Sequence, residues 1–135
     1  MVALPQRMNN RRLDVLIRQL SVEVEGELGF WQFTYDQRQL TVITDESHDR
    51  MRVMTPVTTE GELTSDECKL LLEANFDRAL DAKYALSRGY LWAVFVHPLS
   101  DLSDPLFHDA VEQVKNLADN FRTSYSSTDL VFGGE

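Results

Sequence analysis

The sequence predicts an α+β fold in which a strongly twisted antiparallel sheet packs against helices, in the order α-β-β-β-α-β-β-α. Apolar residues recur at helical spacing near the start, in the middle and near the end of the chain, and two groups of strand-like segments lie between these stretches. Short polar or glycine-containing turns separate the strands within each group, as in antiparallel hairpins. Helices and strands in this mixed order indicate helices that cover one sheet.

The first helix is expected from about Asn10 to Glu25. Its apolar residues follow one another at spacings of three and four, which places them on one face of a helix. Gly26 and Gly29 are expected to end it. The apolar positions are Leu13, Leu16, Ile17, Leu20 and Val24.

Three strands are expected next, over residues 29–36, 39–45 and 50–57, as an antiparallel meander. In the first of them Trp31, Phe33 and Tyr35 alternate with Phe30, Gln32 and Thr34. Side chains on a strand point to its two faces in turn, so this strand should be half buried.

The segment "TSDE" is typical of a helix start, because Thr64 and Glu67 have the spacing of a capping box. Asn75 falls within the apolar stripe of this second helix and needs hydrogen-bond partners there. We expect a structural role for Asn75, bonded to the following turn or to its equivalent across a dimer axis. The apolar stripe consists of Cys68, Leu71, Leu72, Phe76 and Ala79.

Two further strands, "AKYALSRG" and "YLWAVFVHP", meet at Arg88-Gly89, where Gly89 supplies a turn conformation that other residues resist. The second strand has no polar face, so we expect it to be central and covered on both sides. Asp104 is expected to cap a long third helix, with Pro105 in its first turn and apolar residues from Phe107 to Phe121.

Length and charge limit the possible functions. The 135 residues are expected to form one domain, with a folded core over about 10–125 and a loose tail over 126–135. The formal charge of −9 argues against nucleic acid and anionic membrane surfaces as partners. The single cysteine, Cys68, and the lack of a long apolar run indicate a cytoplasmic protein.

No motif indicates an enzyme, and the sequence predicts no catalytic residue, no cofactor and no metal. The loop "DESHD", Asp45 to Asp49, gathers carboxylates around His48, but a solvated turn is the better interpretation because nothing preorganises the loop. An enzyme or metal protein built on this loop and His97 is kept as the least favoured hypothesis.

The segments "LLLEANFDRAL" and "AKYALSRGYLWAVFVHPLSDLSDPLFHDAVEQVKNLADNF" resemble the YbjN family and the related class I type III secretion chaperones. The resemblance rests on Leu71-Leu72 followed by Ala74-Asn75, the paired strands, "HPLSDL" and the closing helix. It implies the same α-β-β-β-α-β-β-α fold, a homodimer and no enzymatic activity.

The resemblance also implies a protein-binding function, in which a homodimer holds a non-globular client segment on the first helix and the sheet. The alternative is a YbjN-type regulatory protein that binds a folded partner. The candidate partner-binding residues are Leu13, Leu16, Leu20, Phe30, Phe33, Val42, Val53 and Met54.

Overall fold

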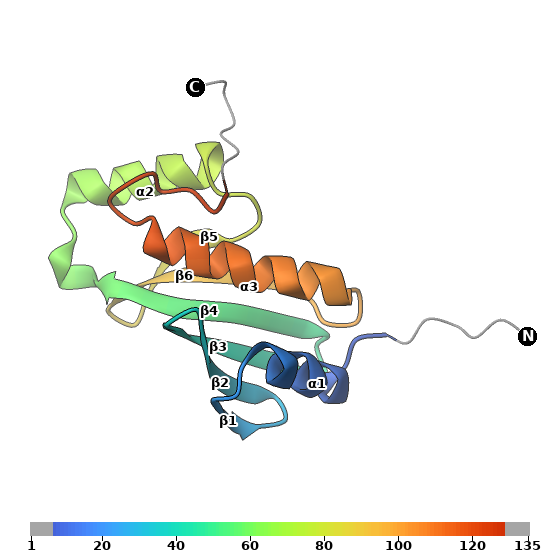
Figure 1. Cartoon of the computed structure of the whole chain (residues 1–135). Coiled ribbons are helices and arrows are strands. Elements are labelled where there is room, and N and C mark those ends of the chain that lie inside the picture. Colours follow the sequence, from blue (N-terminus) through green and yellow to red (C-terminus); the bar gives the residue numbers. More distant parts are fainter. Residues whose placement is uncertain (1–6, 129–135) are drawn as a thin grey trace, which may run out of the picture.

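The computed structural model describes residues 7–128 and forms a six-stranded antiparallel sheet with three α-helices (Figure 1). The spatial order of the strands is β1-β2-β3-β4-β6-β5. This is the predicted α+β class, with one additional strand and a short 3-10 helix, η1. The elements are α1 Asn10–Leu20, β1 Val24–Glu27, β2 Phe30–Tyr35, β3 Arg38–Asp45, β4 Arg50–Thr59, η1 Glu60–Glu62, α2 Ser65–Asp77, β5 Lys83–Ser87, β6 Tyr90–Pro98 and α3 Asp104–Asp119.

The first helix is shorter than predicted, and its expected last turn belongs to a strand. Asn9 caps α1, which ends at Leu20, and Val24 begins β1. The prediction was wrong here because Val24 continues the helical spacing of apolar residues, whereas pairing with Phe33 of β2 draws it into the sheet. Gly26 has a φ of +105°, which permits the β1–β2 hairpin.

The middle strands form the predicted meander, because tight turns connect β2 to β3 and β3 to β4. Asp36 and Gln37 both have positive φ at the β2–β3 turn, which matches the twist that a two-residue hairpin loop requires. The β5–β6 turn has the same form, with φ of 52° at Arg88 and 84° at Gly89. These turns set the register of the sheet.

Local capping signals define the starts of the later helices. The Thr64 hydroxyl accepts from the backbone N–H of Glu67, and the Glu67 carboxylate accepts from the Thr64 N–H, so α2 begins with a capping box. Ser103 caps α3 through the N–H of Leu106, whereas Asp104, the expected cap, occupies the first turn. The expected cap was off by one residue because serine and aspartate are both good caps.

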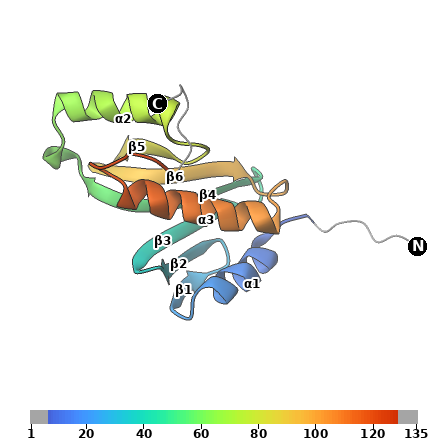
Figure 2. The same ribbon diagram turned by 45° about the horizontal axis from the view of Figure 1, so that its top comes forward.

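Two of the three helices cover the sheet, and the third lies at its edge. Helices α1 and α3 cover one face of the sheet, and α2 lies beside the β5 end (Figures 1 and 2). The core therefore lies in a single layer between the sheet and these helices. Its largest fully buried side chains include Trp31, Phe33, Phe95, Phe107, Leu13 and Ile17.

The segment after α3 is not loose where the structure describes it. Ser126 and Ser127, at the start of the expected tail, are buried. The Ser127 hydroxyl accepts from the Leu80 N–H at 2.9 Å, and the Ser127 carbonyl accepts from the Asn116 carboxamide. The Ser126 hydroxyl donates to the Arg78 carbonyl. The polar composition predicts a free tail, but these two hydroxyls satisfy backbone groups between α2 and β5. The rest of the expected tail, residues 129–135, lies outside the described residues.

Candidate partner-binding surface

The two faces of the sheet differ sharply in burial, as neighbouring cross-strand rows show. Val42, Val53 and Phe95 lie opposite one another on β3, β4 and β6, and all three are buried under the helices. The next row consists of Ile43, Arg52 and Val96 and points the other way, and Val96 is 50% exposed. No described helix covers this second face, which we call the open face.

The open face contains a groove of about 560 Å³ that crosses five strands, from β2 to β5. Its lining is mainly apolar, although the groove is accessible to solvent. Phe30, at its β2 end, is 45% exposed. The lining residues are Phe30, Ile43, Arg52, Met54, Ala85, Ser87, Arg88, Trp92, Val94 and Val96.

Two cations of the groove lack counterions within residues 7–128. The guanidinium groups of Arg52 and Arg88 make no ion pair and no hydrogen bond with any described residue. By contrast, Arg12, Arg38 and Arg122, which lie elsewhere, each bind a carboxylate. The groove thus combines apolar area with unsatisfied positive charge in a chain whose net charge is −9.

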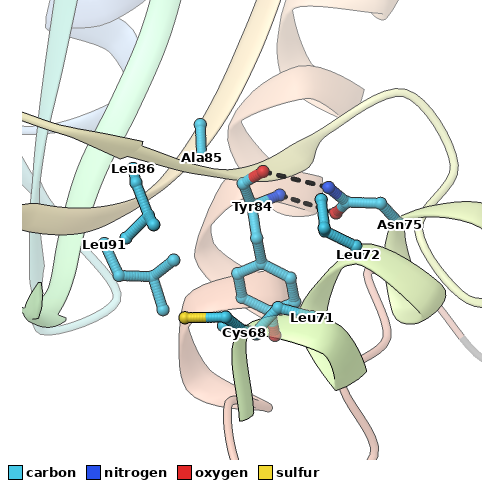
Figure 3. A pocket seen from close by; sticks show the side chains of 8 residues that line it. All are labelled: Cys68, Leu71, Leu72, Asn75, Tyr84, Ala85, Leu86 and Leu91. Carbon is cyan, nitrogen blue, oxygen red and sulfur yellow. Dashed lines mark hydrogen bonds between the residues drawn. The ribbon is translucent and has the colours of Figure 1, made fainter. Parts of the chain in front are cut away.

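A second exposed apolar surface, the α2–β5 patch, consists of Leu72, Phe76 and Leu86. Leu72 is 70% exposed and Phe76 is 82% exposed, although both belong to the stripe that the sequence predicted to be buried. The patch borders an apolar hollow between α2 and β5, which Leu72 and Leu86 line together with Cys68 and Leu71 (Figure 3). The prediction of burial was wrong because only Leu71 and Ala74 of α2 reach the core.

Asn75 connects α2 to the free edge of the sheet. Its carboxamide nitrogen donates to the Tyr84 carbonyl at 3.0 Å, and its oxygen accepts from the Tyr84 N–H at 2.8 Å (Figure 3). The partner is therefore the backbone of edge strand β5. The expected partners, the following turn or Asn75 of a second copy, are not the ones observed. The Lys83 ammonium donates to the Asn75 carbonyl at 2.8 Å and strengthens the junction.

Most residues predicted to contact a partner belong to the core. Leu13 and Leu16 of α1 and Phe33, Val42 and Val53 of the sheet are buried between the sheet and the helices that cover it. A client therefore cannot reach them in this conformation. The prediction overlooked that the first helix and the first three strands bury their apolar residues against each other.

The three other candidates are more accessible. Phe30 and Met54 line the groove on the open face, and Leu20 packs partly buried against the core at the end of α1. The structure brings Phe30 and Met54 together with Trp92, Val94 and Val96, which the prediction missed. Their signal is the lack of a polar face on β6. This pattern predicts cover on both sides, but β6 is covered on one side and lies next to the edge strand.

The residues of the least favoured hypothesis form local structure. The Asp45 carboxylate accepts hydrogen bonds from the Ser47 hydroxyl and the His48 ring, at 2.7 and 2.8 Å. These bonds lower the pKa of Asp45 to about 2, and the bond from Ser47 has the largest effect. His97 lies apart on β6 and donates to the Pro98 carbonyl. Within residues 7–128 no cluster of three or more histidine, cysteine or carboxylate side chains suits a metal ion.

None of the described helices is long and apolar enough to span a membrane.

Comparisons with known proteins identify the fold. No protein-family model and no curated protein matches the chain, so the YbjN part of the resemblance stays a prediction. A chain in the solved HopA1–SchA chaperone–effector complex is similar, with a TM-score of 0.62 and 15% identity over 84% of this chain and 94% of that chain. A chain in the ExsC–ExsE complex has a TM-score of 0.59 and 14% identity, over 83% of this chain and 92% of that chain. The sheet and its helices therefore have the fold of type III secretion chaperones.

Proposed function

We propose that this protein is a non-enzymatic binding module that works as a homodimer and holds an extended segment of a client protein, as a chaperone does. The observation that carries the proposal is the open face of the sheet. Val96 and Phe30 are about half exposed there, whereas side chains in the adjacent row are fully buried. Apolar side chains gathered in a groove favour a protein partner, because covering them releases water at a favourable free energy.

The similarity to chains of two chaperone–effector complexes supports this interpretation. The single cysteine suits a reducing compartment, and we propose a cytoplasmic location on that ground.

The α2–β5 patch is the better candidate for contact with a second copy. A two-fold interface places the same surface on both subunits, so a residue near the axis lies close to its own equivalent, and the other residues contact the same patch of the second copy. Leu72, Phe76 and Leu86 are uncharged and tolerate this arrangement. The groove, in contrast, would bring unpaired arginines close to each other. On the basis of charge, the uncharged α2–β5 patch suits a second copy of the chain, and the arginine-containing groove suits a client.

Light scattering of the purified protein tests the dimer. We expect a mass of twice 15.5 kDa for the native protein and of one chain for Phe76→Asp, because a carboxylate in the patch would face its own copy. Val22→Asp introduces the same charge at a fully exposed residue outside the patch and should remain dimeric. A monomeric native protein would contradict the proposal for the dimer.

Limited proteolysis of a purified complex with a captured partner tests how the partner is held. A chaperone-like function predicts that a short client segment survives on the protein while the rest of the client is digested. Survival of an intact folded partner domain would instead favour the regulatory function implied by the resemblance to YbjN.

A further inference from the structure

We propose that the groove on the open face binds an extended segment in which apolar residues are combined with two carboxylates, and that these carboxylates pair with Arg52 and Arg88. This inference rests on the proposed function, because it specifies the chemistry of the client segment.

The charge of the groove is opposite to that of the whole chain. Its lining contains Arg52 and Arg88 but no carboxylate, in a protein with 22 acidic and 13 basic side chains. A planar guanidinium binds carboxylates through paired hydrogen bonds, and such bonds strengthen when apolar surface excludes water around them. The ligand that would pair with these two arginines is therefore an anionic group with apolar surroundings.

The separation of the two arginines indicates an extended ligand with two anionic groups. Arg52 lies opposite Val96 on β6, and Arg88 follows Ser87, which lies opposite Tyr90. About six residues of β6 separate these points, which corresponds to about 20 Å along the strand. An extended peptide of about six residues covers the same length. A fatty acid offers only one carboxylate and would leave one arginine unpaired.

The distribution of acidic residues on the open face also orients the client. Glu25 and Glu27 lie on the edge strand β1, opposite Gln32 and Phe30. They would repel carboxylates at that end of the face. The acidic residues of the client are thus expected over β4 to β5, and its uncharged apolar residues near Phe30.

The test is selection of peptides of about 12 residues, a length that spans the groove, from a random displayed library on the purified full-length protein. We expect enrichment of sequences with apolar residues and two Asp or Glu residues. Replacing both acidic residues of a selected peptide by Gln should weaken its binding at least about tenfold, as should Arg52→Gln or Arg88→Gln in the protein. The Gln peptide should bind the native protein and both variants nearly equally.

Arg11→Gln is the matched control, since it removes the same charge from an exposed position on α1, which packs on the other face of the sheet. It should bind the acidic peptide as the native protein does. Selection of peptides without acidic residues, or equal binding by Arg52→Gln, would overturn the inference and leave the proposed function intact. Failure to select any peptide, together with a monomeric mass, would overturn both.

Discussion

At the scale of single residues, Asn75 has the clearest role. An edge strand presents backbone groups that can pair with another chain, and proteins protect such edges in various ways. Here one carboxamide satisfies both the N–H and the carbonyl of Tyr84, so it replaces a neighbouring strand at that position. A side chain of α2 thereby satisfies the β5 edge at Tyr84.

Replacing Asn75 by Leu should lower the free energy of unfolding by about 1–3 kcal/mol, because Tyr84 would lose both partners at a partly buried position. Urea denaturation measures this. Glu73→Leu introduces the same side chain on the exposed side of α2 and should change stability by less than about 0.5 kcal/mol. Equal stability of the two variants would show that the carboxamide contributes nothing.

Among the glycines that the structure describes, Gly26 is the one at which an added side chain would meet the closest neighbour. Its φ is +105°, and an added Cβ would overlap the carbonyl oxygen of Phe30. Gly26→Ala should therefore weaken the β1–β2 hairpin and lower the melting temperature. Gly61→Ala is the control, because nothing lies near its added Cβ, and it should melt like the native protein. An unchanged melting temperature for Gly26→Ala would be inconsistent with the described hairpin.

At the scale of elements, the strands β4 and β6 show that an apolar pattern has two possible meanings. Val53 on β4 and Val96 on β6 are both apolar strand residues, but Val53 is fully buried and Val96 is 50% exposed. The difference arises because α3 packs on one face of these strands and no described element packs on the other.

This difference predicts unequal costs for the same substitution. Val53→Ala should destabilise the protein by about 1–3 kcal/mol, since it leaves a cavity in the core. Val96→Ala should cost less than about 0.5 kcal/mol in the free protein, because water already contacts that side chain. Chemical denaturation of both variants at low protein concentration measures the costs. Similar losses would show that the open face is covered in the free protein.

At the scale of the whole molecule, hydrogen-bonded carboxylates make the free energy of unfolding depend on pH in the acidic range. Arg12 lowers the pKa of Asp104, Arg122 lowers that of Glu67, and Ser47 lowers that of Asp45 to about 2. A carboxyl group whose pKa is lower in the folded state stabilises that state above its unfolded pKa, and the contribution disappears as the pH falls through the folded pKa.

We therefore expect a constant melting temperature near neutral pH and a decline from about pH 4 toward about pH 2. Thermal unfolding followed by circular dichroism across this range measures it. A melting temperature that did not change below about pH 4 would contradict the direction of these pKa shifts.

Much of the architecture could be predicted, because local signals carry it. The capping box at Thr64 and Glu67, the turn at Gly89 and the alternation in β2 each depend on neighbouring residues. The strand β1 could not, since four residues of mixed character become a strand only where β2 offers a partner.

The binding surface was predicted less well than the fold. Phe30 and Met54 lie in the groove, but Val42 and Val53 form core, although all four are apolar residues on neighbouring strands. Which side of a strand is covered depends on where α1 and α3 pack, and this information lies far away along the chain. Exposure of Leu72 and Phe76 likewise depends on α2 lying at the β5 end and not over the middle of the sheet (Figure 2).

The sequence by itself determined the order of the helices and of every strand except β1, the capping box of α2, the turn at Gly89, the acidic charge and the apolar character of β6. The tertiary structure alone decided that one face of β6 remains open, that Arg52 and Arg88 share its groove, and that Asn75 closes the edge at Tyr84. The physical reason is that spacing records the character of a side chain, whereas burial and pairing depend on what distant segments place opposite it.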